Sequence, residues 1–171
     1  MNILENIISR RSIRKFNKNS ISSDKIETIL KAAMYAPSAC NEQTWEFVVI
    51  DQKELLEKIP LLSPHAQMAK TAPLAILVCH NVKKEKTEGF FPQDLAAATQ
   101  NLMLAAHSLG IGSVWTGLYP RKTLIESFSN EFNLPDHIIP FSLIILGYPE
   151  GESKEIPSRF CKEAIHYNQY P

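Results

Sequence analysis

The chain has 171 residues, and its 18 Lys and Arg side chains balance its 18 Asp and Glu side chains. Hydrophobic residues make up 44% and charged residues 21%, which indicates one folded domain over residues 1–171 and argues against disorder. The zero net charge argues against a partner that is held by a global field, either a nucleic acid or a membrane surface.

The N-terminal apolar stretch is short and is interrupted by Glu5, so it does not read as a signal peptide. No apolar run approaches the roughly 20 residues of a membrane span. Cys40, Cys79 and Cys161 are odd in number and far apart, which predicts neither a disulfide framework nor a zinc site. The five histidines lack ligand spacing, so no metal site is expected. We therefore expect a cytoplasmic protein.

Apolar residues at helical spacing predict a series of helices along the chain, over residues 2–9, 22–36, 52–59, 94–109 and 121–132. Short apolar runs rich in β-branched and aromatic residues predict strands that are covered on both faces, at 45–50, 74–79, 111–118 and 141–147. This order lacks strict βαβ alternation and therefore favours an α+β fold.

Three segments lie between or after these elements. The helix at 94–109 is apolar around most of its circumference, so it must be buried in the core or against another subunit. Residues 80–91 are the most polar stretch and read as a solvated loop. The tail after Gly147 has little periodicity and is expected to run along a surface.

Residues 10–16 read RRSIRKF and place Arg10, Arg11, Arg14 and Lys15 around Ser12. Cations favour helix C-termini, and solvated basic loops are common, so a structural role is one interpretation. The other is anion binding, because guanidiniums pair with phosphate and the hydroxyl and loop amides add donors. The residues alone leave both open.

Two further segments could approach a ligand closely. PSACNEQTWEF, at 37–47, combines Pro, small residues and Asn before a strand, although an Asx turn would use the same residue types. GIGSVWTGLYP, at 110–120, offers Gly110 as a helix C-cap and Gly117 as a bulge or a point of ligand approach. Neither segment is a dinucleotide fingerprint, and the common P-loop, hydrolase and zinc motifs are absent from the sequence.

In this order, RRSIRKF, APSACNEQTWEFVVI, the Ala-rich helix running into GIGSVWTGLYP, and LIILGYPEG resemble the nitroreductase family of flavoenzymes over almost the whole chain. The resemblance implies an α+β nitroreductase-like fold, with a central mixed, largely antiparallel sheet flanked by helices. It also implies an interlocked homodimer with FMN at the subunit interface. Residues 1–171 would then form a single FMN-binding domain.

The resemblance also implies a set of cofactor-binding residues at the matching positions: Arg10, Arg11, Ser12, Arg14, Pro37, Ser38, Ala39, Asn41, Gln67, Thr116, Gly117 and Arg159. The arginines at 10, 11 and 159, with Ser12, would bind the phosphate and ribityl end. Arg14 would lie near the flavin pyrimidine, where a cation stabilises the negative charge that reduction adds at N1 and O2. Pro157 stands where larger family members often have a second basic residue.

The remaining members of the set would contact the flavin by other routes. The turn from Pro37 to Asn41 would reach the cofactor from the partner subunit. Gln67 would make a polar flavin contact, and the backbone amides of Thr116 and Gly117 would face N5 and O4, where a glycine lets the backbone lie against a flat ring.

The activity implied is an FMN-dependent oxidoreductase with a ping-pong order. NADH or NADPH would pass hydride to the flavin and leave before an electron-poor acceptor, such as a nitroaromatic or a quinone, takes the same place. The cofactor carries the chemistry, so no catalytic side chain is assigned. The alternative is a protein that stores or senses FMN with little turnover, and a nucleic-acid module fits poorly with the zero net charge.

Overall fold

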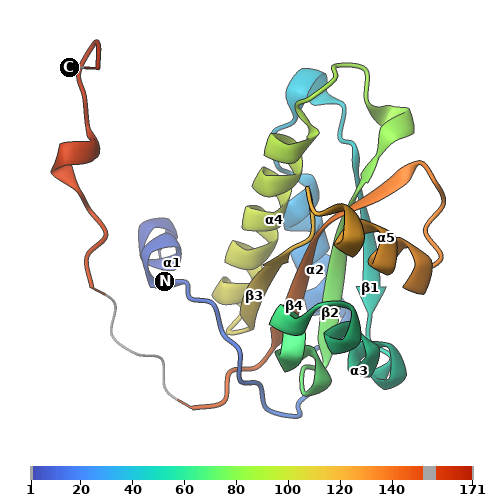
Figure 1. Ribbon diagram of the computed structural model, residues 1–171. Coiled ribbons are helices and arrows are strands. Elements are labelled where there is room, and N and C mark those ends of the chain that lie inside the picture. The colour runs from blue at the N-terminus through green and yellow to red at the C-terminus, as the bar shows by residue number, and fades with distance from the viewer. Residues whose placement is uncertain (1, 152–156, 171) are drawn as a thin grey trace.

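The computed structural model describes residues 2–151 and 157–170 (Figure 1). Its helices are α1 (Ile3–Ser9), α2 (Ser23–Met34), α3 (Lys53–Leu62), α4 (Phe91–Ser108) and α5 (Lys122–Glu131). Its strands are β1 (Trp45–Ile50), β2 (Leu74–Asn81), β3 (Gly112–Gly117) and β4 (Ile138–Gly147). Short 3-10 helices are η1 (Ala39–Asn41), η2 (Pro64–Lys70), η3 (Val82–Lys84) and η4 (Lys162–Ala164).

The strands form one sheet in the order β1-β2-β4-β3, and each neighbouring pair is antiparallel. The α+β prediction is confirmed, whereas the mixed character of the sheet is not found in its named strands. Within residues 2–151 and 157–170, parallel pairing is limited to an isolated bridge between Ser12 and Ser113, where the N-terminal segment meets β3. The chain crosses between strands through short connections and helices that return it antiparallel.

Both faces of the sheet are covered, as the apolar runs of its strands predict (Figure 1). On one face, Ile29 of α2 and Leu102 of α4 pack with Ile76 and Ile144. On the other, Ile59 of α3 and Phe128 of α5 pack against residues of the same strands that point the opposite way. This alternation gives β2 and β4 an almost continuous buried run, which is why their sequences read as apolar throughout. None of the described helices has the length and apolar content needed to cross a membrane.

The long helix α4 is buried against α2 and the sheet, as its composition requires. It ends at Ser108, and Gly110 adopts a φ of +74°, a left-handed conformation that a glycine reaches without a steric penalty. The Ile111 N–H then donates to the Ala106 carbonyl at 2.9 Å, which closes the helix and turns the chain into β3. The expected C-cap glycine is therefore confirmed.

The segment that follows α1 is fixed along the edge of β3. The Ile13 N–H donates to the Ser113 carbonyl at 2.9 Å. A Cβ added to Gly112 would lie 2.8 Å from the Cβ of Ile13, and one added to Gly147 would lie 2.8 Å from the ring of Phe16. Real Cβ contacts are not this short, so both positions require a residue without a side chain. These two glycines let the basic segment lie directly against the sheet.

Residues 80–91 differ from the solvated loop that was predicted. His80 and Asn81 continue β2, and His80 is only 1% exposed. The imidazole stacks on Phe91 with ring centroids 4.1 Å apart and approaches Glu85 Oε2 at 3.1 Å. Because an aromatic ring covers one side of the imidazole and a carboxylate meets its Nε2, a polar residue can be buried here. Residues 82–90 remain mostly exposed, as expected.

The two ends of the chain pack little on the sheet and its helices, although Asn6 Nδ2 of α1 donates to the Leu104 carbonyl of α4 at 3.0 Å. The tail was expected to run along a surface, but residues 157–170 are exposed throughout and extend away from the rest of the protein (Figure 1). Their apolar side chains include Phe160, which is 76% exposed, and Tyr167, which is 83% exposed. On α1, Leu4 and Ile8 are 67% and 68% exposed. The prediction holds for residues 148–150, where the Glu150 N–H donates to the Lys15 carbonyl at 3.0 Å. It fails for residues 157–170, whose apolar side chains remain exposed.

Candidate functional site

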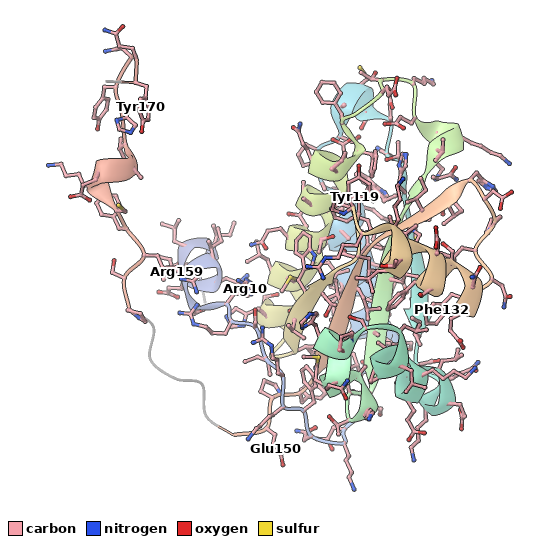
Figure 2. All side chains as sticks on the ribbon, in the orientation of Figure 1. Arg10, Tyr119, Phe132, Glu150, Arg159 and Tyr170 are labelled. Atoms are coloured by element: carbon pink, nitrogen blue, oxygen red, sulfur yellow. The ribbon has the colours of Figure 1, made fainter. Side chains whose placement is uncertain are left out.

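Three guanidiniums from opposite ends of the chain lie close together. Figure 2 shows Arg159, in the tail, near Arg10, at the end of α1. Burial lowers the pKa of Arg10, and the charge of Arg159 lowers it further. The pKa of Arg11 is also lowered, first by loss of solvent and then by Arg159 and Arg10. These like charges repel each other, so the cluster requires a counter-charge.

The cluster has hydrogen-bond donors without acceptors. Arg10 Nη1 and Arg11 Nη2 are buried from solvent and have no hydrogen-bond partner. Arg11 Nη1 is used differently, because it donates to the Arg10 carbonyl at 2.6 Å. No carboxylate of the described residues forms an ion pair with any of the three arginines. A phosphate group would satisfy both the charge and the free donors, because guanidinium binds phosphate in a bidentate geometry.

A histidine, His107, lies beside the cluster. His107 Nε2 lies 2.8 Å from the hydroxyl of Ser9. Burial lowers the pKa of His107, and the charges of Arg10 and Arg11 lower it further. The lowered pKa favours the neutral imidazole, which adds no positive charge to that of the arginines.

A cavity of about 230 Å³ opens next to this basic segment. Its walls come from three parts of the chain: Arg14, the stretch with Ser63 and His65, and the end of β3 with Thr116 and Gly117, beyond which lies Arg121. A Cβ added to Gly117 would meet no atom within 4 Å, so the space over this backbone is open. The structure thus brings Arg14, Thr116 and Gly117 together, as the resemblance implied.

The sequence did not indicate the other walls of this pocket. Ser63 and His65 flank the start of η2, and Arg121 is the residue before α5. Gln67, which was expected to contact the flavin, is exposed on η2 and does not line the cavity. The hydroxyl of Ser63 is buried and lacks a hydrogen-bond partner. An unsatisfied buried group of this kind indicates a ligand, and the sequence alone does not reveal it.

The turn after α2 has an unusual backbone. Cys40, Asn41 and Gln43 have φ values of 50°, 55° and 51°, in the left-handed region that costs energy for residues with a side chain. Side chains hold this shape: the Gln43 N–H donates to Ser38 Oγ at 3.1 Å, and Gln43 Nε2 donates to Asn41 Oδ1 at 3.0 Å. The strain is thus supported locally.

The carboxylate of Asp94 fixes the other side of this turn. The Ala39 N–H donates to Asp94 Oδ1 and Oδ2, both at 3.1 Å, and Asp94 is 8% exposed in the first turn of α4. None of the four residues Pro37, Ser38, Ala39 and Asn41 lines the pocket with Arg14. Within one chain, the structure therefore joins the arginine cluster and the pocket through the N-terminal segment, and leaves this turn as a separate feature.

No group of three or more His, Cys, Asp and Glu side chains in the described part of the chain is arranged to hold a metal ion. Cys79 is buried, and burial raises the pKa of its thiol to about 12, which makes it unreactive. Trp45 is 6% exposed and belongs to the core. The chemical content of the site is therefore cationic side chains, hydroxyls and open backbone.

The sequence model of the nitroreductase family matches residues 7–63 and 61–148. The chain belongs to the nitroreductase family. A family relative from Methanothermobacter thermautotrophicus is 46% identical over 170 residues, which cover 99% of this chain and 88% of that protein. It carries the provisional name NADH dehydrogenase/NAD(P)H nitroreductase.

Solved structures of nitroreductase-like proteins share the fold. A Clostridium acetobutylicum protein, provisionally named an NADH oxidase, is 40% identical with a TM-score of 0.93, and the match covers 96% of this chain and 99% of that one. An FMN-dependent nitroreductase from Clostridium difficile is 29% identical with a TM-score of 0.90, covering 98% and 100%. As a nitroreductase family member, the chain is an oxidoreductase.

Proposed function

We propose that the protein binds FMN and uses NADH or NADPH to reduce electron-poor acceptors such as nitroaromatics or quinones. The observation that carries this proposal is the unpaired cluster of Arg10, Arg11 and Arg159, which suits the phosphate of a mononucleotide. The cluster is continuous, through Ser12, with the pocket at Arg14. FMN, when bound, supplies the two-electron redox chemistry.

The residues of the chain would bind the cofactor and orient it. Arg10, Arg11 and Arg159 hold the phosphate, and Ser12 and Gln67 offer polar contacts. Arg14 contributes a fixed cation at the pocket wall, where it favours the negative charge that two-electron reduction adds to the flavin. The backbone of Thr116 and Gly117 supplies amides. No side chain of the pocket needs to act as a general acid or base.

We infer a ping-pong order from the space available. The open region over Gly117 is the place where a planar substrate can approach the pocket without displacing a side chain. A hydride donor and an electron acceptor would both need this region, so the first would leave before the second binds.

We propose an interlocked homodimer as the working form. Leu4 and Ile8 of α1 and Phe160 of the tail expose large apolar surfaces that a second copy would cover. A groove of about 490 Å³ between α1, α2 and α4 offers a place for such contacts. In the dimer, the turn from Pro37 to Asn41 would reach the cofactor of the partner, which explains why it stands apart within one chain.

We place the protein in the cytoplasm as a single FMN-binding domain spanning residues 1–171. The free thiols of Cys40, Cys79 and Cys161 suit a reducing compartment. No role with nucleic acid or membrane is proposed, because the net charge is zero.

The test is a visible spectrum followed by anaerobic reduction. The purified protein should be yellow, contain FMN, and be bleached by NADH or NADPH; Arg14→Ala should then lower the flavin midpoint potential more than it weakens FMN binding. A colourless protein that takes up no added FMN would overturn the proposal. Tight FMN binding with slow reduction by both nucleotides would indicate a protein that stores or senses FMN and not an oxidoreductase with efficient turnover.

A further inference from the structure

The pocket has basic residues that the cofactor does not account for. Arg10, Arg11 and Arg159 match the phosphate, and Arg14 matches the charge gained on reduction. Arg121 and His65 line the same cavity, and neither has been assigned a part in binding FMN. FMN carries no other anionic group, so the charge of Arg121 and the imidazole of His65 are available to an anion that a substrate brings into the same cavity.

Arg121 stands at the positive end of a helix, beside a second cation. This residue is the N-cap of α5, and Lys122 follows it as the first residue of the helix. The first turn of α5 contains no acidic residue, although a carboxylate is the usual partner of a helix N-terminus. No ion pair among the described residues involves Arg121 or His65. A cation placed at the positive end of a helix dipole is unfavourable unless an anion binds there.

An independent observation indicates that a ligand belongs in this part of the pocket. Ser63 lines the cavity and is 1% exposed, yet its hydroxyl has no hydrogen-bond partner. A buried hydroxyl without a partner is costly, and groups of this kind are usually satisfied in a native complex. A substrate oxygen bound between Arg121 and Ser63 would supply the missing acceptor.

We propose that Arg121, together with His65 and the hydroxyl of Ser63, binds an oxyanion carried by the substrate that enters the pocket. The inference rests on the proposed function and adds a substrate class to it: substrates with a carboxylate or phosphate beside the reacting part are selected over neutral analogues. Arg121 is thus a specificity residue, and its planar guanidinium suits the bidentate recognition of such groups.

Two sources could supply the oxyanion, and two half-reactions separate them. The oxidative arm compares 4-nitrobenzoate with neutral 4-nitrobenzamide as acceptors. The reductive arm compares NADH, which carries a pyrophosphate, with neutral 1-benzyl-1,4-dihydronicotinamide. Both arms use the FMN-loaded protein, and stopped-flow measurements give kcat/KM or its single-turnover equivalent for each substrate.

Arg121→Gln should lower the rate constant for the anionic substrate about tenfold or more in one arm, because a charge-assisted hydrogen bond is lost. The neutral analogue in that arm should change by less than about twofold. Arg121→Lys should recover part of the loss, and His65→Gln should give a smaller loss of the same kind. Lys122→Gln is the matched control, since it removes the adjacent charge without changing the pocket wall.

A binding measurement supports the kinetics. Benzoate should perturb the flavin spectrum of the wild-type protein more strongly than benzamide at equal concentration, and Arg121→Gln should abolish the difference. Losses that are equal for charged and neutral substrates, or absent in both arms, would overturn the inference. FMN content is measured on every variant: a wild-type chain that takes up no FMN overturns the proposed function, whereas full FMN content without a charge-dependent loss overturns only this subsite.

Discussion

The sheet with its covering helices differs from the two chain ends in how its apolar and polar side chains find partners. In the sheet, most side chains are buried against one another: Leu77 is fully buried, and the buried hydroxyls of Thr99 and Ser142 lie 3.2 Å apart. At the ends, Leu4 is 67% exposed and the guanidiniums of Arg10 and Arg159 repel each other. The first region is stabilised by its own contacts, and the second presents surfaces that a further molecule would stabilise.

This difference separates stability from function along one chain. A protein that covers its apolar surface has no need to expose rows of large side chains, so their exposure on α1 and the tail indicates an interface. The cations that repel at the same place indicate an anion. Mutations in the sheet should therefore change the free energy of unfolding, whereas mutations at the ends should change binding and association.

The largest effect is expected in the sheet. Leu77→Ala should lower the free energy of unfolding by about 2–5 kcal/mol, because it leaves a cavity in a fully buried position. Chemical denaturation of the purified protein measures this. Leu61→Ala is the matched control, since Leu61 is 81% exposed on α3, and it should change stability by less than about 0.5 kcal/mol. Similar losses in both variants would contradict the burial pattern.

Removal of the tail should affect binding more than stability. A chain that ends at residue 156 should bind FMN at least about tenfold more weakly, because it loses the charge-assisted contact of Arg159. It should also dissociate to monomers in sedimentation experiments. Arg159→Ala should reproduce the loss of FMN affinity without the loss of dimer, and Lys162→Ala should show neither. A truncated chain that remains dimeric with unchanged FMN affinity would remove the distinction between sheet and ends.

A smaller effect is expected at the strained turn. Asp94→Asn should cost about 1–2 kcal/mol, because the carboxylate accepts from the Ala39 N–H and opposes the dipole of α4. Hydrogen exchange should show faster exchange of the Ala39 amide, with the amides of β2 unchanged. Asp51→Asn, at an exposed position, serves as the control. Unchanged exchange at Ala39 would show that the turn holds its shape without Asp94.

The smallest effect concerns pH. Burial lowers the pKa of His80 below its usual value, and Glu85 and Asp94 oppose this only in part. The unfolded chain therefore takes up a proton at a higher pH than the folded one, so stability is full above about pH 6.5 and falls as the pH drops below it. Between pH 7 and pH 6 the loss due to His80 should be at most about 0.7 kcal/mol.

Comparison of variants isolates the contribution of His80. His107 titrates with the same sign, because its pKa is also lowered, so the wild-type slope alone is not sufficient. His80→Phe keeps a ring to stack on Phe91 and should reduce the slope of unfolding free energy against pH below about pH 6.5. An unchanged slope would mean that His80 is protonated alike in the folded and unfolded chains.

Elements that depend on one chain's own core were predicted well from the sequence. The apolar run from Trp45 to Ile50 is β1, with the predicted bounds, because burial on both faces selects such residues. The apolar circumference of α4 indicated burial, and Gly110 marked its end. In each case, the apolar residues of a segment are those that the segment itself buries, so its composition predicts its structure.

Features made by distant segments were not predicted. Ser63 and His65 are neighbours in the sequence, but Arg121 joins them at the pocket only in space, and none of the three belongs to a motif. His80 read as loop because its burial depends on Phe91 stacking from the next element. The tail has no periodicity that tells which molecule it packs on. The Arg14, Thr116 and Gly117 group was anticipated only through the family resemblance, and its cofactor role remains a prediction.

Gly112 and Gly147, against which the N-terminal segment packs, limit which substitutions the sequence can accept during evolution. Since Gly112 receives Ile13 and Gly147 receives Phe16, a new side chain at either glycine would displace the partner and shift the neighbouring cationic residues with it. In descendants of this sequence, each glycine and its partner should therefore change in step or persist together. A descendant in which only one of the two residues of a pair has changed should have displaced arginines in the N-terminal segment while it still folds.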